Sequence, residues 1–363
     1  LHISPTRFEK YQYCPFGYFL QYILKAAPRQ KAELAPNISG TLTHWVLENA
    51  LRRQGEAFKD LTPEELETLV NDLVDEYTAA NLPGMTLRME YLVGRIRRNL
   101  VGLLGFIQRD LRQSGFQPVA FELRIDDRPD SDDPDAPRVD PVQLDDGRGH
   151  TVRIVGTVDR VDTMELGGKT YIRVVDYKTG TKKFDLREVY YGLDCQMLLY
   201  LFSLTRDADG RFTGAEPAGV LYLLADPAPE TTTRGKAARS MEYKLDGLVR
   251  DEQKVFDAMD AEETGRYLPF SFRGGVPSPY QKEKRADKAK LSRIQLHLDD
   301  LVTQMGEQLY GGCIAAEPLV TGRSPCRWCD YGFICCHEEG IGERALDAPA
   351  KPFEPEEKKE EDQ

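Results

Sequence analysis

Hydrophobic residues in the first third of the chain recur three and four positions apart, which is the period of an α-helix. Ser4-Pro5 combines a helix-capping side chain with a proline suited to the first helical position, so a helix is expected to run toward Cys14. Pro15 interrupts this helix. The same periodicity predicts further helices at residues 16–24, at 41–51 with His44 in the first turn, and in a long insertion at 62–113.

Beyond residue 118 the pattern alternates between apolar and polar positions and becomes rich in Val, Ile and Tyr, as in β-strands. Gly167-Gly168 separates two such stretches and predicts a hairpin turn. The expected strands are 119–125, 152–162, 171–178 and 219–225, and the expected helices are 186–204, 246–264 and 288–311.

This β-β-β-α-β order predicts an α/β fold in which a mixed central sheet is flanked by helices, with helical segments before and after the core. The expected organisation is N-terminal helices (1–52), a helical insertion (53–117), the core (118–230) with an acidic loop (126–146), a helical and basic region (231–312), a cysteine-rich segment (313–345) and a disordered acidic tail (346–363).

The composition suits a protein with a substantial core, since 40% of the 363 residues are hydrophobic and 30% are charged. The chain begins at Leu1 rather than Met, so we expect a fragment of a longer protein. It has no run of about 18 apolar residues and no leader, so a soluble, cytoplasmic bacterial protein is expected. Seven cysteines in a reducing compartment favour metal ligation over disulfide pairing.

The net charge of −12 is concentrated in two segments. Residues 126–146 carry nine acids and two bases, residues 351–363 carry six acids and three bases, and together they supply −10. Residues 273–293 carry seven bases and two acids. Because local patches govern phosphate binding, the acidic total does not exclude DNA. Within residues 273–293, the basic run from Lys282 to Lys290 is either a solvated helix face or a rim that tracks the phosphates of single-stranded DNA.

Two carboxylates and one amine fall at the adjoining ends of the predicted hairpin. Side chains two apart on a strand share a face, so Asp176 and Lys178 project together, and the hairpin brings Asp159 beside Asp176. Paired carboxylates suit Mg²⁺ or Mn²⁺, and such an ion can bind a phosphate oxygen and lower the pKa of water. An isolated Asp-x-Lys is more often a surface salt bridge.

Further polar residues accompany this group. Gln196 and Tyr200 lie four apart, hence on one face of an otherwise apolar helix, and His44 offers an imidazole ligand. Each also has a structural explanation, as a hydrogen-bonded core residue.

Four thiols form a second group, in which Cys14 precedes the core and Cys326, Cys329 and Cys335 follow it. They can act together only if the two ends of the chain meet. Spacing alone leaves both zinc and an iron–sulfur cluster open. Cys336 directly follows Cys335, so either residue could be the terminal ligand, although the spacing favours Cys335.

Taken in order, these residues resemble the RecB-type branch of the PD-(D/E)XK nuclease superfamily, with a restriction-endonuclease-like core. The motifs that carry the resemblance are His44, Gly156-x-x-Asp159-Arg160-x-Asp162, Asp176-Tyr177-Lys178-Thr179-Gly180 and Gln196-x-x-x-Tyr200. The resemblance implies that His44, Asp159, Asp176 and the backbone carbonyl of Tyr177 bind the catalytic Mg²⁺ or Mn²⁺. It also implies that Lys178 is the catalytic lysine, and that Gln196 and Tyr200 support the site and its DNA strand. Glu122 is the acidic residue that it offers on the first strand.

The four cysteines resemble the iron–sulfur subset of this branch, which implies a [4Fe-4S] cluster that staples the N- and C-terminal ends together. Residues 217–222, 245–249 and 326–331 narrow the resemblance to the C-terminal nuclease domain of AddB-type subunits. It implies a metal-dependent DNA exonuclease in a helicase–nuclease complex that resects double-strand breaks for recombination. The implied partners are an AddA-type subunit and a DNA strand fed from duplex ends.

Two other functions are weighed against this one. A catalytically silent module could keep the fold to bind DNA ends as a clamp, but the presence of every motif residue argues against it. A stand-alone iron–sulfur exonuclease of the CRISPR spacer-acquisition type is far shorter than this chain.

Overall fold

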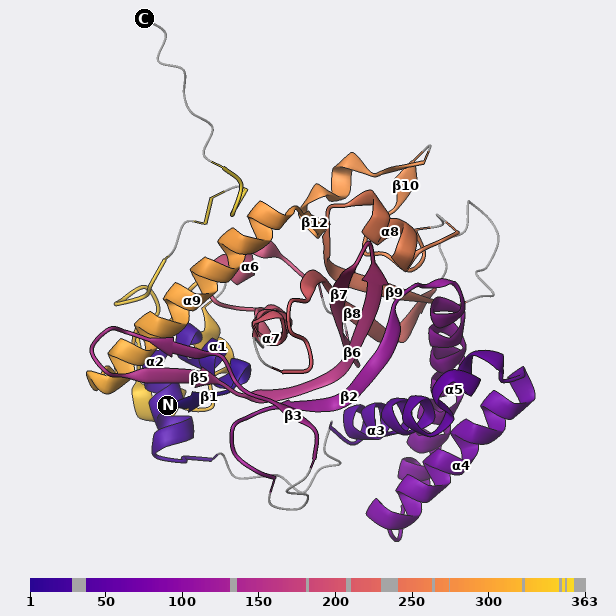
Figure 1. Ribbon diagram of the computed structural model, residues 1–363. Coiled ribbons are helices and arrows are strands. Elements are labelled where there is room, and N and C mark those ends of the chain that lie inside the picture. The colour runs from indigo at the N-terminus through magenta and orange to yellow at the C-terminus, as the bar shows by residue number, and fades with distance from the viewer. Residues whose placement is uncertain are drawn as a thin grey trace, which may run out of the picture.

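The protein is built around a mixed seven-stranded sheet in the order β12-β9-β8-β7-β6-β2-β3 (Figure 1). The computed structural model describes residues 1–27, 37–130, 136–180, 183–206, 210–229, 241–262, 265–273, 275–321, 324–345, 348–349 and 351–355. The strands of this sheet are β2 (Gln117–Ile125), β3 (Arg138–Val139), β6 (Gly156–Leu166), β7 (Lys169–Lys178), β8 (Glu216–Pro229), β9 (Met241–Arg250) and β12 (Arg285–Ala286). The predicted α/β class is confirmed.

The central strands pair in two ways. β2, β6 and β7 form an antiparallel meander, whereas β8 runs parallel to β7. Gly167 and Gly168 turn the chain between β6 and β7 with φ of 60° and 72°, a conformation that glycine adopts readily. The predicted hairpin is therefore confirmed.

Helices cover both faces of the sheet and create two hydrophobic cores. Against one face pack α1 (Pro5–Tyr13), α7 (Gln196–Thr205) and α9 (Lys288–Tyr310). Against the other pack α3 (Asn37–Gln54), α4 (Pro63–Asn81), α5 (Leu87–Gln113) and α8 (Gln253–Met259), so the helical insertion covers this face (Figure 1). Ser4 caps α1 as predicted, and a Thr62–Glu65 capping box starts α4.

Shorter elements complete the described chain. A small sheet contains β1 (His2–Ile3), β5 (Thr151–Ile154) and β4 (Gln143–Asp145), and β10 (Phe272–Arg273) pairs with β11 (Val276–Pro277). The short helices are α2 (Pro15–Tyr18), η1 (Phe19–Ile23), η2 (Gly55–Asp60), α6 (Leu186–Tyr190), η3 (Pro279–Lys284), η4 (Pro325–Trp328) and α10 (Gly332–Cys335). Across the part of the chain that the structure describes, every helix is too short or too polar to span a bilayer.

Two of the predicted elements are divided in the structure. The strand expected at 152–162 is split at Val155 into β5 and β6, which belong to different sheets because β5 pairs with the N-terminal β1. The helix expected at 186–204 is broken into α6 and α7, with Gly192 and Asp194 between them at φ of 76° and 53°.

Two further predictions differ from the structure, one in the type of element and one in the place where a helix begins. The helix expected at 246–264 is wrong, because residues 241–250 form β9 and, among the described residues of that range, only Gln253–Met259 is helical. The apolar residues of this segment alternate along a strand that pairs with β8. Because α3 begins at Asn37, His44 lies in its second turn rather than its first.

The acidic loop is also more ordered than expected where it is described. It contains β3 and β4, and Arg124 contacts Asp130 at 2.6 Å. Residues 131–135 of this loop, and 346–347, 350 and 356–363 of the predicted disordered tail, lie outside the described residues.

Candidate active site and cysteine-lined cavity

The predicted carboxylate–lysine group assembles where β6 begins and β7 ends. The β6–β7 ladder reaches the pair Arg160–Val175, so Asp159 and Asp176 are the next residues on the two strands. Lys178 Nζ lies 2.7 Å from Asp176 Oδ2. Burial raises the pKa of Asp176, and the charge of nearby Asp159 raises it further. The structure therefore brings the two acids and the amine together at one edge of the sheet.

His44 on α3 joins this group from the insertion side of the sheet. Its Nε2 lies 2.8 Å from the carbonyl oxygen of Tyr177, and its Nδ1 lies 3.2 Å from Asp159 Oδ2. Burial lowers the pKa of His44, but the hydrogen bond and charge of Asp159 outweigh it and raise the pKa to about 9. At neutral pH both ring nitrogens therefore carry protons and donate.

Glu122 occupies a more central place than the sequence indicated. Single ligand atoms of His44, Glu122 and Asp159 all lie within 4.8 Å of one another, so this tight group contains Glu122 in place of Asp176. Burial, followed by the charges of Asp159 and Glu48, raises the pKa of Glu122 to about 7. Glu122 lies opposite Asp159 in the antiparallel β2–β6 pair, between the partners Phe121–Arg160 and Leu123–Val158, and this register was not available from the sequence.

Gln196 and Tyr200 support the start of β6 from α7. Both lie on one face of the helix as predicted, and the Gln196 side chain and the backbone of Thr157 hydrogen-bond to the Tyr200 hydroxyl. A Cβ atom on Gly156 would lie 2.2 Å from that hydroxyl oxygen, so only glycine fits beneath it. Burial raises the pKa of Tyr200 to about 12 and keeps the phenol protonated.

The donor set of this site fits a hard divalent cation. It offers carboxylate oxygens, an imidazole and the Tyr177 carbonyl, which are ligand types that Mn²⁺ or Mg²⁺ accepts. Asp176 Oδ2 is buried beside Lys178 but receives no well-directed hydrogen bond from a described residue. A buried carboxylate oxygen in this condition gains from a cation.

The four predicted cysteines line one cavity of about 580 Å³ between the two ends of the chain. Cys14 lies between α1 and α2, Cys326 belongs to η4, Cys329 follows it, and Cys335 ends α10. The Gly17 N–H donates to Cys14 Sγ at 3.5 Å. Burial raises the pKa of Cys335, and the other three thiols raise it further through their charge. The ends of the chain therefore meet, as the spacing required.

Cys335 and Cys336 are adjacent but differ in position. Cys335 lines the cavity, whereas Cys336 is exposed, has a left-handed backbone with φ of 52°, and donates its S–H to Phe333 O at 3.6 Å. The geometry agrees with the spacing that favoured Cys335.

The basic run is partly occupied by internal contacts. Lys284 is buried and bonds to Asp246, and Lys290 is buried and bonds to Glu354 at 2.8 Å. Lys282 and Lys288 are both exposed, and Lys288 Nζ lies 3.1 Å from Glu216 Oε1. The run is therefore neither a wholly solvated helix face nor a continuous rim of available lysines.

The mixed sheet flanked by helices is consistent with a nuclease class that comparison with known families identifies. The model of the PD-(D/E)XK nuclease superfamily matches residues 2–336, and the chain belongs to that superfamily. The prediction of this family from the motifs is thereby confirmed.

Comparison with individual proteins shows which members of the superfamily this chain is similar to. The chain is 30% identical over 354 residues to the B subunit of the ATP-dependent helicase/deoxyribonuclease of Thermoanaerobacter sp. (strain X514), covering 93% of this chain and 30% of that protein. Proteins of the same name from Clostridium tetani and Clostridium novyi are 30% and 29% identical, over 94% and 92% of this chain. The predicted similarity to AddB-type subunits is confirmed, and the chain spans about 30% of the length of these relatives.

Proposed function

We propose that this chain is a divalent-cation-dependent deoxyribonuclease domain that hydrolyses phosphodiester bonds as an exonuclease. The observation that carries the proposal is the convergence of His44, Glu122, Asp159, Asp176 and Lys178 at one edge of the sheet. Membership of a nuclease superfamily supports the same chemistry.

Each residue of the site has a role in this proposal. His44, Asp159, Asp176 and the Tyr177 carbonyl hold the cation, and we add Glu122 because it lies within 4.8 Å of His44 and Asp159. A bound Mg²⁺ or Mn²⁺ would supply positive charge to the scissile phosphate and lower the pKa of water there.

Lys178 is the catalytic lysine of the proposal. Its ammonium group, held by Asp176, orients the attacking water or stabilises negative charge that develops on the phosphate. Tyr200 and Gln196 hold the start of β6, so that Asp159 keeps its position relative to Asp176. A protonated His44 must lose a proton before either nitrogen can act as a ligand.

We further propose that Cys14, Cys326, Cys329 and Cys335 hold a [4Fe-4S] cluster with a structural role. No three of the sulfur atoms of these four cysteines, all of which the structure describes, lie within 4.8 Å of one another, a separation wider than the tetrahedron around one zinc ion with sulfur at about 2.3 Å. The N–H group directed at Cys14 Sγ is a contact that stabilises thiolate ligands. Zinc without iron in the purified protein would contradict this assignment.

The biological setting follows from the relatives. Proteins named as the B subunit of a helicase/deoxyribonuclease support a role for this chain in a bacterial, cytoplasmic helicase–nuclease that resects DNA breaks for recombination. Its partner in this proposal is an AddA-type subunit, and its substrate is a single strand fed from a duplex end.

Digestion of end-labelled single- and double-stranded DNA, with and without Mg²⁺, tests the proposed activity. We expect Asp176→Ala and Lys178→Ala to abolish cleavage. Lys169→Ala, at the opposite end of β7 and paired with Glu216, is the matched control and should cleave like the wild type.

A silent DNA-end clamp would give a different result. Binding of DNA by the wild-type protein without Mg²⁺-dependent cleavage would support the clamp and contradict the nuclease. Unchanged cleavage by Asp176→Ala or Lys178→Ala would refute the roles given to these residues.

A further inference from the structure

Tyr177 makes three polar contacts, two of them to proposed ligands of the cation and one to a buried arginine. Its backbone N–H donates to Asp159 Oδ2 at 3.1 Å, and its carbonyl oxygen accepts from His44 at 2.8 Å. Its hydroxyl accepts from Arg160 Nη1 at 3.2 Å. The first two contacts hold proposed ligands, whereas the third lies deep between the sheet and the helical insertion.

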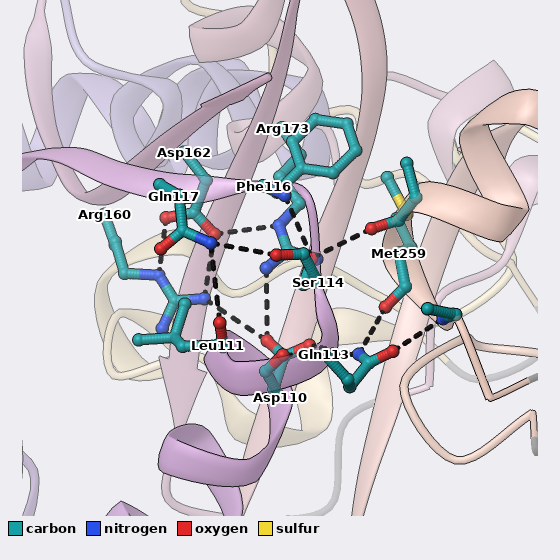
Figure 2. A network of polar contacts seen from close by, with 12 residues as sticks. Asp110, Leu111, Gln113, Ser114, Phe116, Gln117, Arg160, Asp162, Arg173 and Met259 are labelled. Carbon is teal, nitrogen blue, oxygen red and sulfur yellow. Dashed lines mark hydrogen bonds and ion pairs between the residues drawn. The ribbon is translucent and has the colours of Figure 1, made fainter. Parts of the chain in front are cut away.

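The Arg160 end of this arrangement is a buried network of charged residues (Figure 2). Arg160 forms two hydrogen bonds of 2.8 and 2.9 Å with the Asp162 carboxylate. Arg173 donates to the same carboxylate at 2.8 Å and to Asp110 Oδ2 at 3.1 Å. The exposed fractions of Arg160, Asp162 and Arg173 are 2%, 0% and 0%, and that of Asp110 is 5%.

Burial makes this network rigid. A charged group withdrawn from water is strongly destabilising unless its partners stay in place, so each guanidinium and carboxylate constrains the next. Two arginines balance two aspartates, which leaves the network neutral. The side chain of Tyr177, only 3% exposed, is attached to its edge.

The network also joins the sheet to the insertion. Asp110 belongs to α5, whereas Arg160 and Asp162 belong to β6, and Arg173 belongs to β7. Gln113 and Ser114, at the end of α5, bond in turn to the backbone near α8 (Figure 2). The backbone of Tyr177 pairs with Leu223 of β8, and the network that bonds to its hydroxyl extends from the sheet to α5.

We propose that Tyr177 is a positioning residue, whose hydroxyl is held by the Arg160–Asp162–Arg173–Asp110 network so that its backbone presents Asp159 and His44 to the cation. This inference rests on the proposed function, because it concerns the same site. It also gives a role to the second half of the Gly-x-x-Asp-Arg-x-Asp motif, since Asp159 faces the cation while Arg160 and Asp162 hold the strand behind it.

Tyr177→Phe tests the inference because it removes only the hydroxyl. The matched control is Tyr243→Phe, which removes a buried hydroxyl bonded to Asn99 at 2.8 Å, on the same side of the sheet. Both variants are titrated with Mn²⁺ alone by calorimetry, and their urea midpoints are recorded. We expect Tyr177→Phe to weaken Mn²⁺ binding about tenfold, as loss of a supporting contact does, and Tyr243→Phe to leave it unchanged.

Three outcomes would overturn the inference. Tyr177→Phe could bind Mn²⁺ like the wild type, both variants could weaken binding equally in step with their loss of stability, or the wild type could bind no Mn²⁺. If Tyr177→Phe fails to fold, Arg160→Lys replaces it, because it keeps the charge of the network and loses the Nη1 donor to the Tyr177 hydroxyl, and unchanged Mn²⁺ binding would overturn the inference. Mn²⁺ binding that responds to Tyr177→Phe in a protein that cuts no DNA would instead refute the proposed function alone.

Discussion

The two candidate metal centres of this protein differ in how the polypeptide holds them. In the carboxylate–lysine site, His44 is bonded to Asp159 and to Tyr177, and Asp176 is bonded to Lys178, so the side chains are already in direct contact. The four cysteines, each within the described part of the chain, line one cavity of about 580 Å³, and no three of their sulfur atoms lie within 4.8 Å of one another. The first centre is organised by the fold, whereas the second depends more on the group that it binds.

The difference follows from chain connectivity. The ligands of the first site come from hydrogen-bonded neighbours in one sheet and from a helix packed on it. The cysteines come from opposite ends of the chain, and closing so long a loop costs conformational entropy that a shared metal group can offset. Loss of bound metal should therefore affect mainly chemistry at the first centre and mainly stability at the second.

The largest expected effect is a difference between substituting Cys335 and substituting the adjacent Cys336. Cys335→Ser should remove iron and visible absorbance and destabilise the protein by about 3–5 kcal/mol, the range for opening a long cross-linked loop. Cys336→Ser is the control and should keep both, because its side chain is exposed and turned toward Phe333. Iron analysis and urea unfolding measure the difference. Equal iron loss in both variants would show that the terminal ligand is not fixed.

An intermediate effect is expected at the first centre. Gly156→Ala places a Cβ 2.2 Å from the Tyr200 hydroxyl oxygen, so Tyr200 or the start of β6 must move. Because a displacement of about 1 Å costs on the order of 100-fold in rate, DNA cleavage should fall about 10- to 100-fold while iron content stays normal.

Gly94→Ala on α5 is the control for this glycine, because the nearest atom to its Cβ is a flexible arginine tip at 3.8 Å. Full activity of Gly156→Ala would show that the Tyr200 contact does not position Asp159.

The smallest expected effect is a dependence on pH of the free energy of unfolding of the cation-free protein. The pKa of His44 is raised to about 9, so its contribution to stability is complete below its ordinary pKa near 6.5 and is lost as pH rises through about 9. The shift corresponds to about 3 kcal/mol at most, and because the His44 side chain is 30% exposed and partly screened, we expect the free energy of unfolding to fall by about 1–3 kcal/mol over that interval. His44→Gln should remove this fall. A wild-type stability that stays constant between these pH values would contradict the assigned contacts of His44.

Alternating and helical periods predicted much of the fold, because they record which face of an element is buried. They predicted the β6–β7 hairpin and the long helices α4, α5 and α9 correctly. They did not locate the division at Val155, because it arises from pairing with β1 at the other end of the sequence. The sequence periods also did not distinguish the strand β9 from a helix, because the apolar positions of so short a segment fit both patterns.

The candidate site was predictable where its residues share a strand or a helix, as Asp176 and Lys178 do, and as Gln196 and Tyr200 do. Glu122 was underestimated because its approach to Asp159 depends on the register of β2 against β6, in which the two residues lie opposite each other. The contact between Arg160 and the Tyr177 hydroxyl was missed because it depends on the register of two strands and on α5.

Calorimetric titration with Mn²⁺ tests the central claim most directly, namely that these side chains hold a divalent cation. The wild-type protein should bind Mn²⁺, and Asp159→Asn and Glu122→Gln, which change charge but hardly shape, should each weaken that binding at least about tenfold. Binding that is unchanged in both variants would place the cation elsewhere and contradict the account.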